Sequence, residues 1–263
     1  MDFDDLSHEE KNQVAKGFDA TPELIPFIPY LLQDLWELGS SPNVIIDILK
    51  SLNLSSDAKV LDLACGKGAV SIQISDKLGF RCHGIDLFKP FIFEATNRAK
   101  EFGLTNLCSF EVESIHTAVK VKRNFDVVIL ASAETLLGNI DQTIQILREC
   151  IVTRGFIIFD GSYLKDKSSI KNPEYSVLKQ YNKTIKLLTS QGDKLIAEIK
   201  IPIEETIAID KRYTRLIKIR AEELSVKYPE KKSLLMKYVQ KQEDECEIIE
   251  KETVGCVWCL QKK

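Results

Sequence analysis

Hydrophobic and polar positions follow two periodicities between Pro42 and Leu164. Short apolar runs predict the strands Lys59–Leu63, Arg81–Ile85, Leu107–Val112, Phe125–Ala131 and Gly155–Asp160. Apolar residues at helical spacing predict the helices Asn43–Leu52, Ala69–Leu78, Pro90–Phe102 and Asp141–Cys150. Strands joined through helices form right-handed βαβ units. We therefore predict an α/β fold with a Rossmann-like, doubly wound and mostly parallel sheet.

The segment between the first predicted strand and the next helix is the most informative part of the chain. Leu61 to Gly68 reads L-D-L-A-C-G-K-G. Gly66 and Gly68 lack the Cβ atoms that would keep a ligand away from the backbone, and the amides at a helix start favour an anionic group. Asp86 ends the next strand, where a carboxylate can accept hydrogen bonds from ribose hydroxyls. Together these features predict a cofactor that carries adenosine.

A nicotinamide dinucleotide is the first alternative, because its sites use the pattern G-x-G-x-x-G. Counting from Gly66, the third glycine position is occupied by Ser71, so this pattern is incomplete. Asp62, directly before the loop, is not part of it either. A nucleotide-dependent oxidoreductase therefore stays a rival that these two residues argue against.

The segment Leu61–Gly68 resembles motif I of the class I S-adenosylmethionine-dependent methyltransferases, in which an acidic residue precedes G-x-G-x-G. Ala64 stands at the first glycine position, which is a small departure. The resemblance covers about residues 42–164, and Thr253–Leu260 fits the antiparallel last strand of that fold. It implies a methyltransferase that uses S-adenosylmethionine.

The resemblance also implies roles around the methionine part of the cofactor. Asp62 would orient the amino end, and Ala131 and Ser132 would border the methyl group. Four loop residues would line the methionine and ribose with their backbone: Ala64, Cys65, Gly66 and Gly68. The alternative for Asp62 is a polar residue without a special role.

On the adenosine side, the resemblance implies that Asp86 holds the ribose hydroxyls and that Leu87 packs on the adenine. Glu113 would contact the adenine amino group, and Ser114 would supply a backbone amide beside it. Asp86 could instead cap a helix, and Glu113 could be a solvated strand end.

Two residues are candidates for orienting or deprotonating the methyl acceptor. Glu134 follows the predicted strand Phe125–Ala131, and Tyr163 follows Gly155–Asp160. A general base is required only where the nucleophile binds in its protonated form. The lack of an obvious catalytic pair therefore does not count against an enzyme.

The acceptor is predicted mainly by elimination. The Asn/Asp-Pro-Pro-aromatic loop of many enzymes that methylate amino groups of nucleic acids or of protein glutamine is replaced by Ala131-Ser132-Ala133-Glu134. A small-molecule acceptor is favoured, with RNA or protein as the rival and a non-catalytic binding protein as a further one. An RNA acceptor is indicated by a cluster of basic residues: Lys211, Arg212, Arg215 and Lys218. Glu222 and Glu223 follow closely, which is typical of a solvated helix face.

The flanks of the core show mainly helical periodicity, with long helices predicted at Tyr175–Leu188, Lys211–Tyr228 and Lys231–Ile248 and one strand at Leu195–Ile201. We predict a single domain, in which the flanks form a helical cap over the ligand edge of the sheet. Its parts are an N-terminal cap (1–41), the cofactor-binding core (42–164), a substrate cap with one core strand (165–252) and the closing strand (253–263).

Composition narrows the remaining possibilities. The formal net charge of -3 argues against a dedicated nucleic-acid binder. No apolar run approaches the roughly 20 residues that span a bilayer, and the polar, acidic start predicts a cytoplasmic protein. Cys256 and Cys259 form C-x-x-C on a predicted strand, where positions i and i+3 face opposite sides. With no metal-binding spacing among the histidines, we expect no metal.

Overall fold

The computed structural model describes residues 7–166, 175 and 178–263. The chain divides into two compact units, each taken by itself below. The core unit comprises Glu37–Ile201 and Val254–Lys263, and the helical unit comprises Met1–Trp36 and Pro202–Thr253. The predicted cap segment 165–252 is thus divided between the units, and its residues 167–174 and 176–177 lie outside the described residues.

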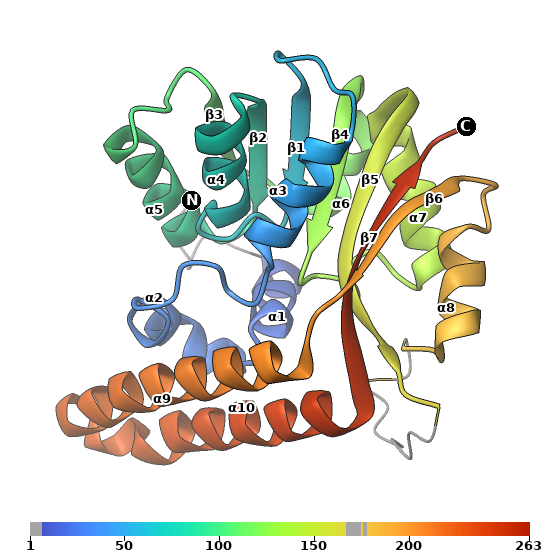
Figure 1. Cartoon of the computed structure of the whole chain (residues 1–263). Coiled ribbons are helices and arrows are strands. Elements are labelled where there is room, and N and C mark those ends of the chain that lie inside the picture. Colours follow the sequence, from blue (N-terminus) through green and yellow to red (C-terminus); the bar gives the residue numbers. More distant parts are fainter. Residues whose placement is uncertain (1–6, 167–174, 176–177) are drawn as a thin grey trace. The chain divides into compact units, whose positions relative to one another are not determined.

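The core unit contains a seven-stranded sheet with helices on both faces (Figure 1). Its strands are β1 (Lys59–Leu63), β2 (Arg81–Asp86), β3 (Cys108–Val112), β4 (Phe125–Ala131), β5 (Ile151–Leu164), β6 (Lys194–Lys200) and β7 (Thr253–Gln261). Its helices are α3 (Pro42–Ser51), α4 (Ala69–Leu78), α5 (Lys89–Glu101), α6 (Ile115–Val121), α7 (Ile140–Cys150) and α8 (Tyr181–Leu188).

The strand order is β3-β2-β1-β4-β5-β7-β6. The first five strands pair in parallel, and β6 pairs with β7 in antiparallel orientation. This confirms the predicted Rossmann-like, mostly parallel sheet with an antiparallel last strand. The chain order reverses at β1, which lies between β2 and β4. Sheets of this kind bind ligands at the carboxyl ends of the strands beside such a reversal, so we expect the site there.

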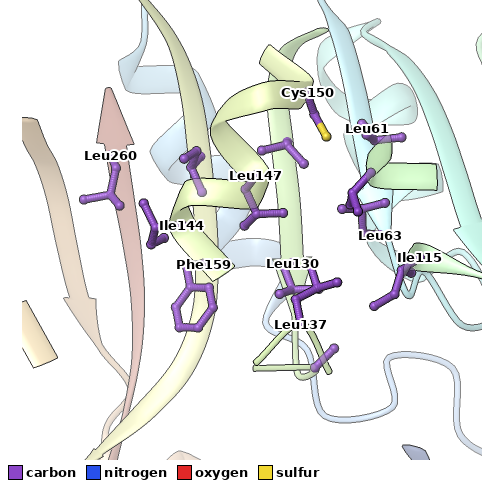
Figure 2. Packing of buried hydrophobic residues seen from close by; sticks show 14 of the residues in the cluster. Leu61, Leu63, Ile115, Leu130, Leu137, Ile144, Leu147, Cys150, Phe159 and Leu260 are labelled. Atoms are coloured by element: carbon purple, nitrogen blue, oxygen red, sulfur yellow. The ribbon is translucent and has the colours of Figure 1, made fainter. Parts of the chain in front are cut away.

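Two apolar layers hold the sheet between its helices. One layer packs α6, α7 and α8 against one face, and Figure 2 shows part of it, including Leu61, Leu130 and Leu147. The other packs α3 and α4 against the opposite face. Cys256 belongs to the first layer and Cys259 to the second, and both are fully buried. The two thiols therefore point to opposite faces of β7, as their spacing predicts.

The helical unit consists of α1 (His8–Gly17), η2 (Pro22–Phe27), α2 (Ile28–Leu31), α9 (Ile203–Lys227), η4 (Pro229–Lys231) and α10 (Lys232–Glu252). Polar contacts join its two sequence segments. Arg220 donates to Asp34 at 2.6 and 3.1 Å, and the Tyr30 hydroxyl donates to Glu223 at 2.8 Å. None of the described helices is long and apolar enough to cross a membrane.

The structure differs from the sequence-based prediction in several elements. The short helix α6 was not predicted, and α9 begins at Ile203 rather than at Lys211. The helix predicted over 175–188 begins at Tyr181, and α8 packs on the core sheet against α7 rather than among the cap helices. Helical periodicity identifies an apolar stripe but not the surface that the stripe covers.

Candidate functional site

The loop between β1 and α4 has a backbone that few residue types adopt. Ala64, Gly66 and Gly68 have φ angles of 57°, 51° and 72°, in the left-handed region. Glycine reaches this region without a steric cost, whereas an alanine does so at about 1 kcal/mol. The conformation at Ala64 explains why the resembling motif has glycine at that position.

Close packing beneath the loop also requires glycine. A Cβ on Gly68 would lie 2.8 Å from the Phe110 ring and 2.9 Å from the Ala95 Cβ. On the strand β2, a Cβ on Gly84 would lie 2.6 Å from Phe110 and 2.8 Å from the Cys65 sulfur. Phe110 of β3 thus supports the loop from below. It was not predicted from the sequence, because only the pairing of β2 with β3 brings it to the loop.

Asp86 ties the loop to the end of β2. Its Oδ2 accepts the Gly66 amide at 2.9 Å, and its Oδ1 accepts the Phe88 amide at 2.8 Å. Burial raises the pKa of Asp86, and the amide hydrogen bonds partly offset this effect. Each carboxylate oxygen has two lone pairs, so both oxygens retain capacity for a hydroxyl. Leu87 lies between Asp86 and Phe88 in the chain and is half-buried.

Asp62 is fixed inside the unit by the helix that follows the loop. The Ser71 hydroxyl donates to Asp62 Oδ2 at 2.6 Å, and Asp62 is 2% exposed. Burial raises the pKa of Asp62 to about 7. Ser71, which stands where a dinucleotide site would have its third glycine, is therefore the hydrogen-bond partner of the acidic residue.

Glu113 and Ser114 follow β3 at the same edge of the sheet. The Glu113 amide donates to the Asp86 carbonyl at 3.1 Å. Its Oε2 is buried without a hydrogen-bond partner among the described residues, although Lys122 Nζ lies 3.5 Å away. The Ser114 hydroxyl accepts the His116 amide at 3.3 Å and caps α6. A buried carboxylate oxygen with spare capacity fits a ligand donor such as an amino group.

Ala131 is the last residue of β4, where it pairs with Asp160 of β5, and Ser132 follows it. Ser132 has a φ of 51°, and its amide nitrogen lies 3.3 Å from the Asp160 carbonyl oxygen. A Cβ on Gly39 would lie 3.4 Å from the Ser132 hydroxyl oxygen, so the segment before α3 reaches this edge too.

Two carboxylates lie just beyond β4 and within β5, namely the half-buried Glu134 and the buried Asp160. Glu134 accepts the Ser162 amide at 2.7 Å and the Ser162 hydroxyl at 3.2 Å. Asp160 accepts the Ser41 amide at 3.1 Å. Burial raises the pKa of each carboxyl to about 7. Asp160 was not predicted as a site residue, although its place at the end of an apolar strand could have indicated it.

Tyr163, the second catalytic candidate, is 7% exposed and belongs to the apolar layer beneath α7 and α8. Its ring centroid lies 5.2 Å from that of Tyr181 and 6.3 Å from that of Trp258. These contacts account for the residue by packing, and a catalytic role for Tyr163 stays a prediction.

The arrangement as a whole fits an adenosine-bearing amino-acid cofactor. A loop of left-handed residues lies between Asp62 and Asp86, and Glu113 follows the neighbouring strand at the same edge. Among the described residues, no group of three or more His, Cys, Asp or Glu side chains could hold a metal ion.

Comparison with known proteins agrees with this fold. A family model described as a methyltransferase domain matches residues 54–251, which is more than half of the chain. A solved S-adenosylmethionine-dependent methyltransferase from Thiobacillus denitrificans, in complex with S-adenosylhomocysteine, superposes with a TM-score of 0.76 at 16% identity. The match covers 90% of this chain and 98% of that chain.

Two curated relatives match shorter regions. An uncharacterized RNA methyltransferase of Lactococcus lactis is 32% identical over 105 residues, 39% of this chain and 19% of the relative. Phosphoethanolamine N-methyltransferase of Plasmodium falciparum is 32% identical over 81 residues, 31% of this chain and 29% of the relative. The chain therefore matches less than a third of the length of either relative.

The family match and the fold confirm the resemblance seen in the glycine loop. This chain belongs to the methyltransferase domain family, and its fold is that of solved S-adenosylmethionine-dependent methyltransferases.

Proposed function

We propose that this chain transfers the methyl group of S-adenosylmethionine to a small-molecule acceptor. The observation that carries the proposal is the pair of hydrogen bonds from Gly66 and Phe88 to opposite oxygens of the half-buried Asp86. They hold a carboxylate next to a glycine loop, whose backbone a ligand can approach closely. The phosphoethanolamine enzyme among the relatives supports a small acceptor.

The cofactor would be held by the residues at the carboxyl ends of the parallel strands. Asp86 would bind the ribose hydroxyls, with Leu87 packed on the adenine. Glu113 would accept from the adenine amino group, beside the Ser114 amide. Asp62 would orient the amino end of the methionine part, and Ala64, Cys65, Gly66 and Gly68 would line it with backbone. Ala131 and Ser132 would border the methyl group.

When bound, S-adenosylmethionine supplies an electrophilic methyl group on a positively charged sulfur. The chain's own contribution is to position the acceptor and to exclude water from it. Near neutral pH, Glu134 is poised to take a proton, because burial raises its pKa to about 7. The Ser162 amide and hydroxyl hold that carboxylate in place.

Titration calorimetry with S-adenosylmethionine, S-adenosylhomocysteine and NADH tests the cofactor first. Binding of the first two and not of NADH is expected. Methyl-labelled cofactor is then offered with a panel of small amines, alcohols and acids, and separately with total RNA. Label in the small-molecule fraction supports the proposal, and label only in RNA contradicts it.

The role of Glu134 has its own kinetic signature. Because a general base acts in its ionised form, kcat/KM of the wild type is expected to rise with pH through about 7. Glu134→Gln keeps an acceptor for the Ser162 amide and should lose that rise together with about 10²-fold or more of the rate. A Gln variant with wild-type rates and an unchanged pH profile removes Glu134 from the mechanism.

RNA is the second candidate acceptor, because a specific surface and a relative favour it. The basic cluster on α9 comprises Lys211, Arg212, Arg215 and Lys218, and all four residues are exposed, so a phosphate backbone could meet them. If these residues bind such a backbone, RNA retention should fall steeply with salt. Retention that does not depend on salt, or no retention, leaves the small-molecule acceptor.

A further inference from the structure

A lysine lies fully buried in the middle of the glycine loop. Lys67, between Gly66 and Gly68, has an exposed fraction of 0%. Lysine is almost never fully buried unless its charge is paired, and none of the roles assigned so far involves this side chain. Its place inside the cofactor loop therefore calls for a separate explanation.

Within the described part of the chain, Lys67 forms an ion pair with a carboxylate on α5. Lys67 Nζ lies 3.1 Å from Glu94 Oε2, and it lies 5.2 Å from the centroid of the Phe91 ring. The other oxygen of Glu94, Oε1, accepts from Arg98 Nε at 3.0 Å and from Arg98 Nη2 at 2.8 Å. Glu94 thus directs one oxygen to the loop, and the other is held by Arg98 of its own helix.

The Lys67–Glu94 pair joins the same two segments that Asp86 joins. Asp86 binds the loop amide of Gly66 and the amide of Phe88, which precedes α5. The pair links the next loop residue to the second turn of α5. The loop would line the methionine and ribose, and the segment before α5 would carry the adenine contact, so the two links together set the width of the proposed cofactor site.

The loop needs such a constraint because its backbone is unusual. Three of the five residues from Ala64 to Gly68 have positive φ angles. In an unconstrained loop, glycine moves readily between positive and negative φ angles. The Lys67–Glu94 ion pair resists that relaxation, because separating its partners leaves the buried charge of Lys67 without this compensating carboxylate. The pair therefore favours one loop conformation in the ligand-free protein.

We propose that Lys67 is a positioning residue for the cofactor, and that its ion pair with Glu94 holds the glycine loop in its ligand-binding conformation before the ligand arrives. The inference rests on the cofactor site of the proposed function. Lys67 does not contact the ligand itself, because its side chain is enclosed beside Phe91 and Glu94 rather than exposed at the loop surface.

The test uses Lys67→Met, Glu94→Gln and the double variant in the full chain. If the binding-competent loop falls to about a tenth of the population, S-adenosylhomocysteine affinity falls about tenfold. The KM for S-adenosylmethionine should rise by the same factor while kcat at saturation stays unchanged. Hydrogen exchange of amides 64–68 in the ligand-free protein should become faster. The double variant should lose little more than either single one.

Lys77→Met is the matched control, because Lys77 is an exposed lysine on the helix that follows the loop. It should leave affinity and loop exchange unchanged. If Lys67→Met does not fold, Glu94→Gln carries the test, because the Glu94 side chain is 30% exposed.

Wild-type affinity and loop exchange in both single variants would overturn the proposal. So would a loss of affinity in Lys67→Met alone, which would mean that Lys67 acts on the ligand directly. A wild-type protein that binds neither S-adenosylmethionine nor S-adenosylhomocysteine contradicts the proposed function instead, which separates the two failures.

Discussion

Each oxygen of the Asp86 carboxylate has its own amide partner, Gly66 on one side and Phe88 on the other. An asparagine has only one acceptor oxygen, so Asp86→Asn must lose one of these hydrogen bonds and the negative charge. We expect S-adenosylhomocysteine binding to weaken roughly tenfold or more, as hydrogen bonds to charged groups contribute about 1.5–3 kcal/mol. Calorimetry provides the dissociation constants.

Asp57→Asn is the control for this change, since Asp57 is exposed and lies outside the site. It should bind as the wild type does. If Asp86→Asn also bound normally, the assignment of Asp86 to the ribose would have to be abandoned.

The raised pKa of Asp160 is expected to make the stability of the folded protein depend on pH. Burial raises its pKa from the ordinary value of 3.8 to about 7. Between these two pH values the unfolded state releases its proton while the folded state keeps it, so Asp160 lowers stability progressively as pH rises from about 4 to about 7. Below this window both states are protonated and the effect disappears.

Asp160→Asn keeps an acceptor for the Ser41 amide and removes the ionisation. Urea unfolding of the ligand-free variant should show a gain over the wild type at pH 8, on the order of a few kcal/mol. Little or no gain is expected at about pH 4. An equal effect at both pH values would show that the charge of Asp160 is not the cause.

At the scale of elements, the loop depends on how closely β2 and β3 pack beneath it. A Cβ on Gly84 of β2 would lie 2.6 Å from Phe110 and 2.8 Å from the Cys65 sulfur. Gly84→Ala should therefore destabilise the protein by about 1–3 kcal/mol through overpacking. It should also weaken cofactor binding, because Cys65 belongs to the loop.

Gly17→Ala serves for comparison, because a Cβ there meets no atom within 4 Å. Urea midpoints of the two variants distinguish local overpacking from a general effect of replacing glycine. Adding Phe110→Leu should restore part of the stability lost by Gly84→Ala. A stable Gly84→Ala protein would mean that β2 and β3 separate more easily than their packing indicates.

At the scale of the whole molecule, every residue proposed to hold the cofactor belongs to the core unit. A ligand that binds only the folded state adds about 2.7 kcal/mol of stability at a hundred times its dissociation constant. Saturating S-adenosylhomocysteine should therefore slow hydrogen exchange most in the loop 64–68 and at residues 86–88 and 113–114.

The helical unit should respond less to the cofactor alone. Amides of α9 and α10 are expected to change little until an acceptor is added, because substrate binding is predicted for these flanks. Stronger cofactor protection in α9 than in the loop would contradict the placement of the cofactor. The same hydrogen-exchange experiment tests the prediction that both units act as one methyltransferase domain, since adding the acceptor should then protect amides of the helical unit as well.

Much of the core could be predicted from the sequence. Phe125–Ala131 and Lys59–Leu63 were predicted with the bounds that the structure has, because buried parallel strands are nearly continuous apolar runs. The loop Ala64–Gly68 was recognisable because its conformation depends on glycine at fixed, local positions. The helix α6 was missed, since seven residues give too few turns for a clear period.

Local pattern along the chain determined the strands, the glycine loop and the acidic residues that follow the strands. Only the tertiary structure showed that Phe110 lies beneath the loop, that Asp160 accepts the Ser41 amide and that Lys67 is buried against Glu94. The physical reason is that periodicity reports which side of an element is apolar. The partner of a buried charge is chosen by the pairing of strands and the packing of helices, which join residues far apart in the chain.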